Sequence, residues 1–109
     1  MAMSSGPRMT MATQAVLRTL LEDPTRPRYG FDIAGEAGIA TGSLYPILAR
    51  LEHLTWLDSY WEDVADVHDG RPRRRYYRLS DTGAVAARDA LDRASRRVPK
   101  SWRPAAGLA

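Results

Sequence analysis

The sequence of 109 residues contains no cysteine. Disulfide bonds, thiol nucleophiles and cysteine-based zinc sites are therefore excluded. The two histidines, His53 and His68, are too few to build a metal site by themselves. No apolar run approaches the roughly 18 residues of a membrane span, and the first nine residues lack the apolar core of a signal peptide. These absences predict a cytoplasmic protein with no membrane segment, and the sequence indicates no cofactor. The length of 109 residues predicts a single domain.

Most of the positive charge lies in one short segment, although the formal net charge is only +3. Residues 58–70 hold five acidic side chains and no basic one, whereas residues 71–79 hold five arginines and no acidic one. Arginines next to tyrosines favour contact with a polyanion such as nucleic acid. The residues of this segment that we expect at such a contact are Arg71, Arg73, Arg74, Arg75, Tyr76 and Arg78.

The most informative predicted helix covers residues 41–54. Large apolar residues recur there with the i, i+3, i+4, i+7 spacing of a stripe that faces the core: Leu44, Ile47, Leu48, Leu51 and Leu54. Thr41 or Ser43 is expected to cap the helix, and Pro46 is expected in its first turn, where the missing N–H costs least. The other face carries little charge and suits close approach to another surface, through Thr41, Gly42, Ser43, Tyr45, Pro46 and Arg50. An ordinary solvent-exposed helix face is the alternative interpretation.

Two shorter helices are predicted before this one. The first runs from about Thr10 to Leu21 and the second from Phe31 to Ala37, with a loop at residues 25–28 between them. Gly38 is expected to end the second helix, and only two or three residues then remain before the third helix begins. The second and third helices must therefore meet at a sharp angle, as in a helix-turn-helix unit.

The apolar period changes from helical to alternating after residue 54. Residues 56–62 and 73–79 are short, rich in aromatic residues and separated by turn residues, which predicts a β-hairpin with a long tip. Tyr77 and Leu79 share one strand face and are expected to pack on the helices. The arginines at the tip and on the outer face would then contact a phosphate backbone, as a wing does beside a recognition helix.

A last helix is predicted at residues 80–98, with Ser80 as its cap. Small residues follow alternating steps of three and four along it and form a seam that lets another helix come close. Because this seam is expected to be exposed in the single chain, we interpret it, together with Val16, as the contact between two subunits. The seam consists of Ala84, Ala87, Leu91, Ala94 and Val98.

Two other groups of residues have simpler interpretations. The acidic cluster at residues 63–69 lacks the spacing of a calcium loop, so a solvated acidic tip is favoured over a metal site. Trp56, Tyr60 and Trp61 are interpreted as hairpin packing, with base stacking as the alternative. No nucleophile, base and orienting group can be assembled from the sequence, so we do not expect an enzyme.

These elements and motifs resemble the PadR family of winged-helix transcriptional regulators over about residues 10–98. The most specific parts are Leu44-Tyr45-Pro46 followed by Arg50-Leu51-Glu52, and RYYRLS at residues 75–80 closed by Gly83. A single helix after the second strand is similar to the short-tailed branch of the family. The expected fold is mainly α with a small β-hairpin, a winged helix-turn-helix followed by a C-terminal dimerisation helix.

The resemblance implies a homodimer that binds a palindromic operator in double-stranded DNA and acts mainly as a repressor, relieved in some members by a small aromatic effector. Multidrug-sensing members use a tryptophan on the last helix, where the stretch around Ala94 offers only alanine and serine. The implied division is a flexible tail at 1–9, a DNA-binding domain at 10–79, a dimerisation helix at 80–98 and a second flexible tail at 99–109. A winged-helix module that binds protein without sequence-specific DNA binding is the alternative.

Overall fold

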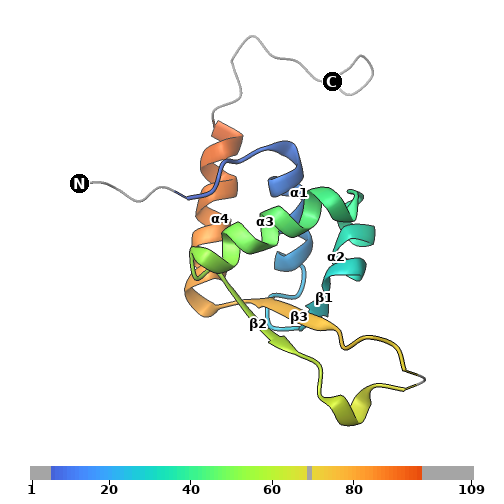
Figure 1. Ribbon diagram of the computed structural model, residues 1–109. Helices are drawn as coiled ribbons and strands as arrows, with labels where there is room; N and C mark the ends of the chain where they lie inside the picture. Colours follow the sequence, from blue (N-terminus) through green and yellow to red (C-terminus); the bar gives the residue numbers. More distant parts are fainter. Residues whose placement is uncertain (1–5, 69, 97–109) are drawn as a thin grey trace.

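A computed structural model describes residues 6–68 and 70–96 of the chain (Figure 1). This part contains a three-stranded antiparallel sheet and α-helices in the order of a winged helix. In chain order the elements are α1 (Met11–Leu21), β1 (Arg28–Tyr29), α2 (Gly30–Ala37), α3 (Thr41–His53), β2 (Leu57–Trp61), the 3₁₀ turn η1 (Val64–Asp66), β3 (Arg75–Leu79) and α4 (Asp81–Arg96). The predicted fold class is confirmed, and so is the order of the four helices and the hairpin. Within the described ranges, no helix is long and apolar enough to cross a membrane.

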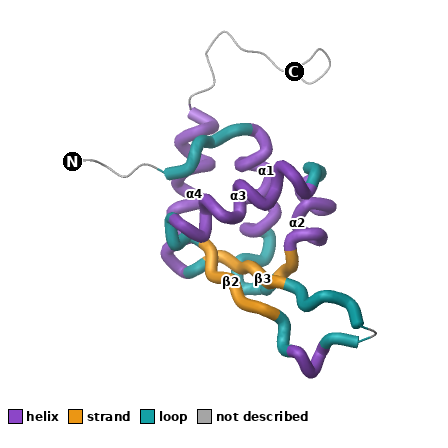
Figure 2. The backbone as a smooth tube through the Cα atoms, in the orientation of Figure 1, coloured by secondary structure: helices purple, strands orange, loops and turns teal. Residues whose placement is uncertain are grey.

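The core lies between the helices and one face of the sheet (Figure 2). Leu44, Leu48 and Leu51 of α3 have no exposed surface, as the predicted stripe requires. They pack with buried residues of α1, α2 and both long strands, among which Val16 is also fully buried. The tip of the hairpin extends away from this core (Figure 1).

The first turn of α3 differs from the prediction in two respects. Its cap is Ala40, whose carbonyl accepts from the amides of Ser43 and Leu44 at 3.0 Å, and no side chain caps the helix. Thr41 is the first helical residue, so Pro46 lies beyond the first turn. Because proline has no N–H, the carbonyl of Gly42 loses its helical donor. Gly42 is exposed, so water can replace that donor.

The sheet contains one strand that the sequence pattern did not predict. Arg28 and Tyr29 pair with β3 opposite Tyr77 and Tyr76, so the strand order is β1-β3-β2 and the predicted loop is wrong at Arg28. A two-residue strand is too short to produce an alternating pattern. The predicted hairpin is confirmed with shorter strands, and the side chains of Tyr77 and Leu79 are buried against the helices as expected.

The end of α3, the start of β2 and the start of α4 meet at one tight junction. Thr55 has a φ of 62°, and the amide of Trp56 donates to the carbonyl of Leu51 at 3.0 Å, which ends α3 in a Schellman motif. Ser80 is confirmed as the cap of α4: its hydroxyl accepts from the amide of Gly83 at 2.9 Å. The amide of Ser80 donates to the carbonyl of Trp56, also at 2.9 Å.

The seam predicted on the last helix is partly internal. Ala84 and Ala87 are buried in the core of the single chain, where α4 packs on α1, so the expectation that they are exposed is wrong. Small side chains allow this close approach of α4 to its own domain. Leu91 and Ala94 remain partly exposed, and Val98 lies outside the described residues.

Replacing Gly83 with alanine should destabilise the fold, because a Cβ there would lie 2.7 Å from the carbonyl carbon of Trp56 and closer still to its oxygen. We expect the free energy of unfolding to fall by about 1–3 kcal/mol in chemical denaturation, as for other overpacked sites. Gly35→Ala is the matched control, since nothing lies within 4 Å of that position. The control should be neutral or stabilising, and equal stabilities of the two variants would contradict this account.

Candidate nucleic-acid interface

The solvent face of α3 is exposed where the sequence predicts an interface. The structure places all six predicted residues on the surface: Thr41, Gly42, Ser43, Tyr45, Pro46 and Arg50. This arises because the three leucines on the opposite side of the helix are fully buried. Between Thr41 and Arg50 the exposed face of α3 carries hydroxyl groups and no charged side chain. This surface can therefore approach a polyanion without repulsion.

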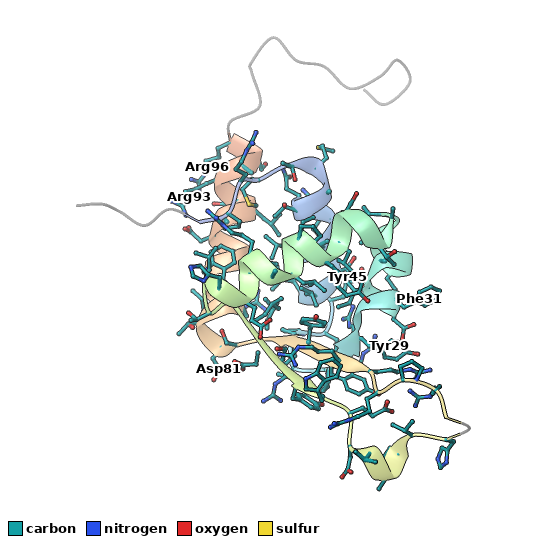
Figure 3. The ribbon with its side chains drawn as sticks, viewed as in Figure 1. Tyr29, Phe31, Tyr45, Asp81, Arg93 and Arg96 are labelled. Carbon is teal, nitrogen blue, oxygen red and sulfur yellow. The ribbon has the colours of Figure 1, made fainter. Side chains whose placement is uncertain are left out.

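Tyr45 links this face to the start of α2. A Cβ built on Gly30 would lie 2.5 Å from the Tyr45 hydroxyl and 2.7 Å from its ring, so the tyrosine lies directly on the glycine. Figure 3 shows Tyr45, Phe31 and Tyr29 on the side of the molecule where the two helices meet the sheet. The absence of a side chain at position 30 therefore leaves the space that the Tyr45 ring occupies.

A cleft of about 610 Å³ lies between α2, α3 and the wing. Phe31 is 72% exposed and Trp61 53% exposed, which is high for large apolar side chains. The cleft combines apolar and cationic groups, and its lining residues are Tyr29, Gly30, Phe31, Asp32, Tyr45, Trp61, Pro72, Arg73, Arg74, Arg75 and Tyr77. Phe31 was not predicted as a surface residue of the site, because one exposed aromatic residue at the start of a short helix has no distinguishing pattern.

Two of the five wing arginines are held by carboxylates. Arg71 donates to both oxygens of Glu62, at 2.9 and 2.8 Å, and the Glu62 side chain is only 7% exposed. Arg75 lies 3.4 Å from Glu52, donates to the hydroxyl of Ser59 at 2.7 Å and stacks over Trp61. Arg71 and Arg75, both expected at a phosphate contact, are therefore already paired with carboxylates in the single chain.

The other three wing arginines form no ion pair with any described residue. Arg73 is exposed, and its Nε donates to the carbonyl of Glu62 at 2.9 Å. The guanidinium carbon of Arg74 lies 4.2 Å from the centre of the Tyr29 ring. Arg78 is exposed on β3. These side chains keep the charge that a phosphate contact requires.

Tyr76 belongs to an aromatic cluster on the outer face of the sheet. Its ring stacks on Tyr60 at 5.6 Å and meets the edge of Tyr29 at 5.7 Å. Tyr76 is partly buried by these contacts, and its first role is to join the three strands. This arrangement agrees with the interpretation of Tyr60 as hairpin packing.

Arg8 is a candidate that sequence patterns did not reveal. It lines a hollow of about 320 Å³ together with Arg50, between the segment before α1 and the middle of α3. Both arginines are exposed. A single arginine in a segment predicted as a tail gives no periodic signal. Only the fold brings it beside the exposed face of α3.

The acidic tip holds a local turn. Asp63 accepts from the amide of Ala65 at 3.0 Å and begins the 3₁₀ turn. Among residues 6–68 and 70–96, no three acidic, histidine or cysteine side chains gather to hold a metal ion. Asp69, which the sequence places in the same cluster, lies outside the described residues.

The family of the chain follows from comparison with known proteins. A model of the Transcriptional regulator PadR-like family matches residues 16–89. The chain is similar to a PadR family transcriptional regulator from Eggerthella lenta, with 26% identity and a TM-score of 0.60 over 79% of this chain and 76% of that one. It is also similar to the protein smu.1704 of Streptococcus mutans, with 27% identity and a TM-score of 0.60 over 83% of this chain and 85% of that one.

A curated relative, Uncharacterized protein X of Lysinibacillus sphaericus, is 32% identical over 76 residues. The match covers 62% of this chain and 63% of that protein. A PadR family transcription regulator from Clostridium difficile, at 22% identity and a TM-score of 0.57, shares the fold over 80% of this chain and 85% of that one.

Because Glu62 pairs with Arg71, the stability of the wing should fall as the solution becomes acidic. Hydrogen bonds from Arg71 lower the pKa of Glu62 from 4.5 to about 2, although desolvation opposes this shift. A carboxyl group with a lowered folded-state pKa contributes stability above pH 4.5, and this contribution is lost as the pH falls towards 2. We therefore expect the difference in Tm between the wild type and Glu62→Gln to shrink over that range. A difference independent of pH would contradict the assignment.

Proposed function

Since the chain belongs to the PadR-like family of transcriptional regulators, whose members regulate transcription by binding DNA, we propose that it is a sequence-specific repressor that binds a palindromic operator as a homodimer. Residues 10–79 would form the DNA-binding domain, and the single helix after them would serve dimerisation, as in the short-tailed branch. The observation that carries the proposal is the exposed face of α3, which has no charged side chain before Arg50, beside wing arginines that form no ion pair with described residues.

In this proposal the start of α3 enters the major groove. Ser43 and Tyr45 would face base edges, because both are exposed and carry hydroxyl groups. Arg50 and Arg8 would contact phosphates beside the groove, and Arg73, Arg74 and Arg78 would contact the backbone next to it. Phosphate contacts fix the register of the protein on DNA, while the base contacts select the sequence.

We infer the homodimer from the small number of base pairs that one subunit can contact. One recognition helix and one wing contact few base pairs, so two copies about one helical turn apart, roughly 34–36 Å, are needed to select an operator. The partly exposed side of α4, with Leu91 and Ala94, would supply the contact. Ala84, Ala87 and Val16, which were also expected at this contact, are buried in the core of their own subunit and cannot touch a partner there.

Relief of repression by a small aromatic effector is part of the same proposal, and a fall in operator affinity on addition of phenolic acids would test it.

A winged-helix module that binds another protein is the second candidate, favoured by the exposed Phe31 and Trp61. The two candidates differ in the effect of salt. Log affinity for DNA should fall linearly with log salt concentration, whereas an apolar protein contact should show little dependence.

Selection of bound sequences from random DNA should yield a palindrome. On that operator Arg50→Ala should weaken binding by on the order of tenfold, because one charged group in each subunit no longer reaches the DNA, with an unchanged Tm because the side chain is exposed. Arg88→Ala, the same change on an exposed site of α4, is the control and should bind like the wild type. Equal affinities of the two variants would remove Arg50 from the interface.

Replacing both Arg73 and Arg74 with alanine should weaken binding to all sequences by a similar factor. The slope of log affinity against log salt should become shallower by about one unit for each phosphate that the variant no longer neutralises. Sequence preference should survive, because these residues are assigned to the backbone. A changed preference with an unchanged slope would mean that the wing reads bases.

Ala94→Asp should shift the protein from dimer to monomer in sedimentation at micromolar concentration and abolish tight operator binding. Ala94 is partly exposed, so helical circular dichroism should be retained. Leu91→Asp should act in the same direction, with a lower Tm because Leu91 also packs on the core. If both variants remain dimeric, the subunits meet elsewhere, and the exposed Met11 of α1 becomes the leading candidate.

A further inference from the structure

Glu62 is the acidic residue that binds the wing segment formed by residues 71–74. Its carboxylate accepts from both Nη atoms of Arg71 and, at 3.1 Å, from the amide of Arg74. Its carbonyl accepts from Nε of Arg73 at 2.9 Å, and its amide donates to the carbonyl of Arg74 at 2.7 Å. Main-chain and side-chain groups of one residue thus bind three of the four residues in the segment.

The burial of Glu62 makes these hydrogen bonds stable. The residue is 6% exposed, whereas Arg73 on the same segment is exposed to solvent. The contact through Nε occupies one of the five N–H donors of Arg73 and leaves the two Nη groups for another acceptor. The backbone of Arg74 is fixed at both its amide and its carbonyl, while its guanidinium lies over Tyr29.

We propose that Glu62 is a positioning residue for DNA binding: it orders residues 71–74 so that the guanidinium groups of Arg73 and Arg74 are presented to backbone phosphates. This inference rests on the proposed DNA-binding function. Ordering the segment before the encounter lowers the conformational entropy that binding would otherwise cost. The buried carboxylate therefore strengthens binding to a polyanion.

Charge alone predicts the opposite effect. Glu62→Gln removes a negative charge from the wing and would release Arg71, so simple electrostatics predicts tighter DNA binding by this variant. Loss of positioning predicts weaker binding, because glutamine cannot accept on both oxygens from Arg71. The sign of the change in affinity separates the two accounts.

The test compares Glu62→Gln with Asp66→Asn, which makes the same change of charge in the turn η1. The wild type and both variants are titrated with the selected operator over a range of salt concentrations. Glu62→Gln should bind on the order of tenfold more weakly, with a shallower salt slope, and Asp66→Asn should bind as tightly as the wild type or more tightly. Equal or tighter binding by Glu62→Gln would overturn the proposal.

A general loss of stability is distinguished by a second background. In the variant that lacks the side chains of Arg73 and Arg74, Glu62→Gln should cause no further loss of affinity, because the residues through which it acts are absent. A further loss of the same size in that background would show that Glu62 acts by another route and would overturn the proposal.

Limited digestion with trypsin reports on the segment without DNA. The peptide bonds after Arg73 and Arg74 should be cleaved several times faster in Glu62→Gln than in the wild type, and at the wild-type rate in Asp66→Asn. Unchanged cleavage in Glu62→Gln would show that Glu62 does not order the segment. If the wild type binds no DNA but cleavage changes as expected, the proposed function fails while the ordering by Glu62 stands.

Discussion

Burial of three leucines on one side of α3 determines much of this molecule. Leu44, Leu48 and Leu51 lose all exposed surface, and each such side chain contributes about 1.5–3 kcal/mol when it leaves water. A helix anchored in this way cannot rotate about its axis without exposing the stripe. The same burial that closes the core therefore also fixes which residues of α3 face outward, so the stability of the fold and the proposed DNA contact depend on one constraint.

The wing arginines differ in their partners. Arg71 pairs with Glu62 inside the wing and closes its loop, whereas Arg75 pairs with Glu52 and so joins β3 to α3. The remaining arginines lie on a scaffold that these pairs make rigid. A count of positive charges along the sequence therefore overstates the charge that the wing can offer to a partner, and the acidic residues beside it belong to the same construction.

Long periodic segments could be predicted from the sequence, whereas features that depend on contacts between distant residues could not. The stripe of α3, the stop at Gly38 and the cap at Ser80 follow local rules, and the structure has each of them. The strand at Arg28 and the place of Arg8 beside α3 depend on neighbours far along the chain. For the same reason, the alanine seam of α4 looked exposed although much of it faces its own core.

The junction at Trp56 has a mechanical consequence. The Trp56 carbonyl accepts from the amide of Ser80, and Gly83 lies directly against it. The base of the hairpin and the first turn of α4 are therefore joined at this peptide group. Thr55, which ends α3, has a left-handed backbone that a β-branched residue adopts only under strain, so the surrounding contacts must stabilise this corner. The orientation of the wing is therefore tied to that of α4 through one peptide group.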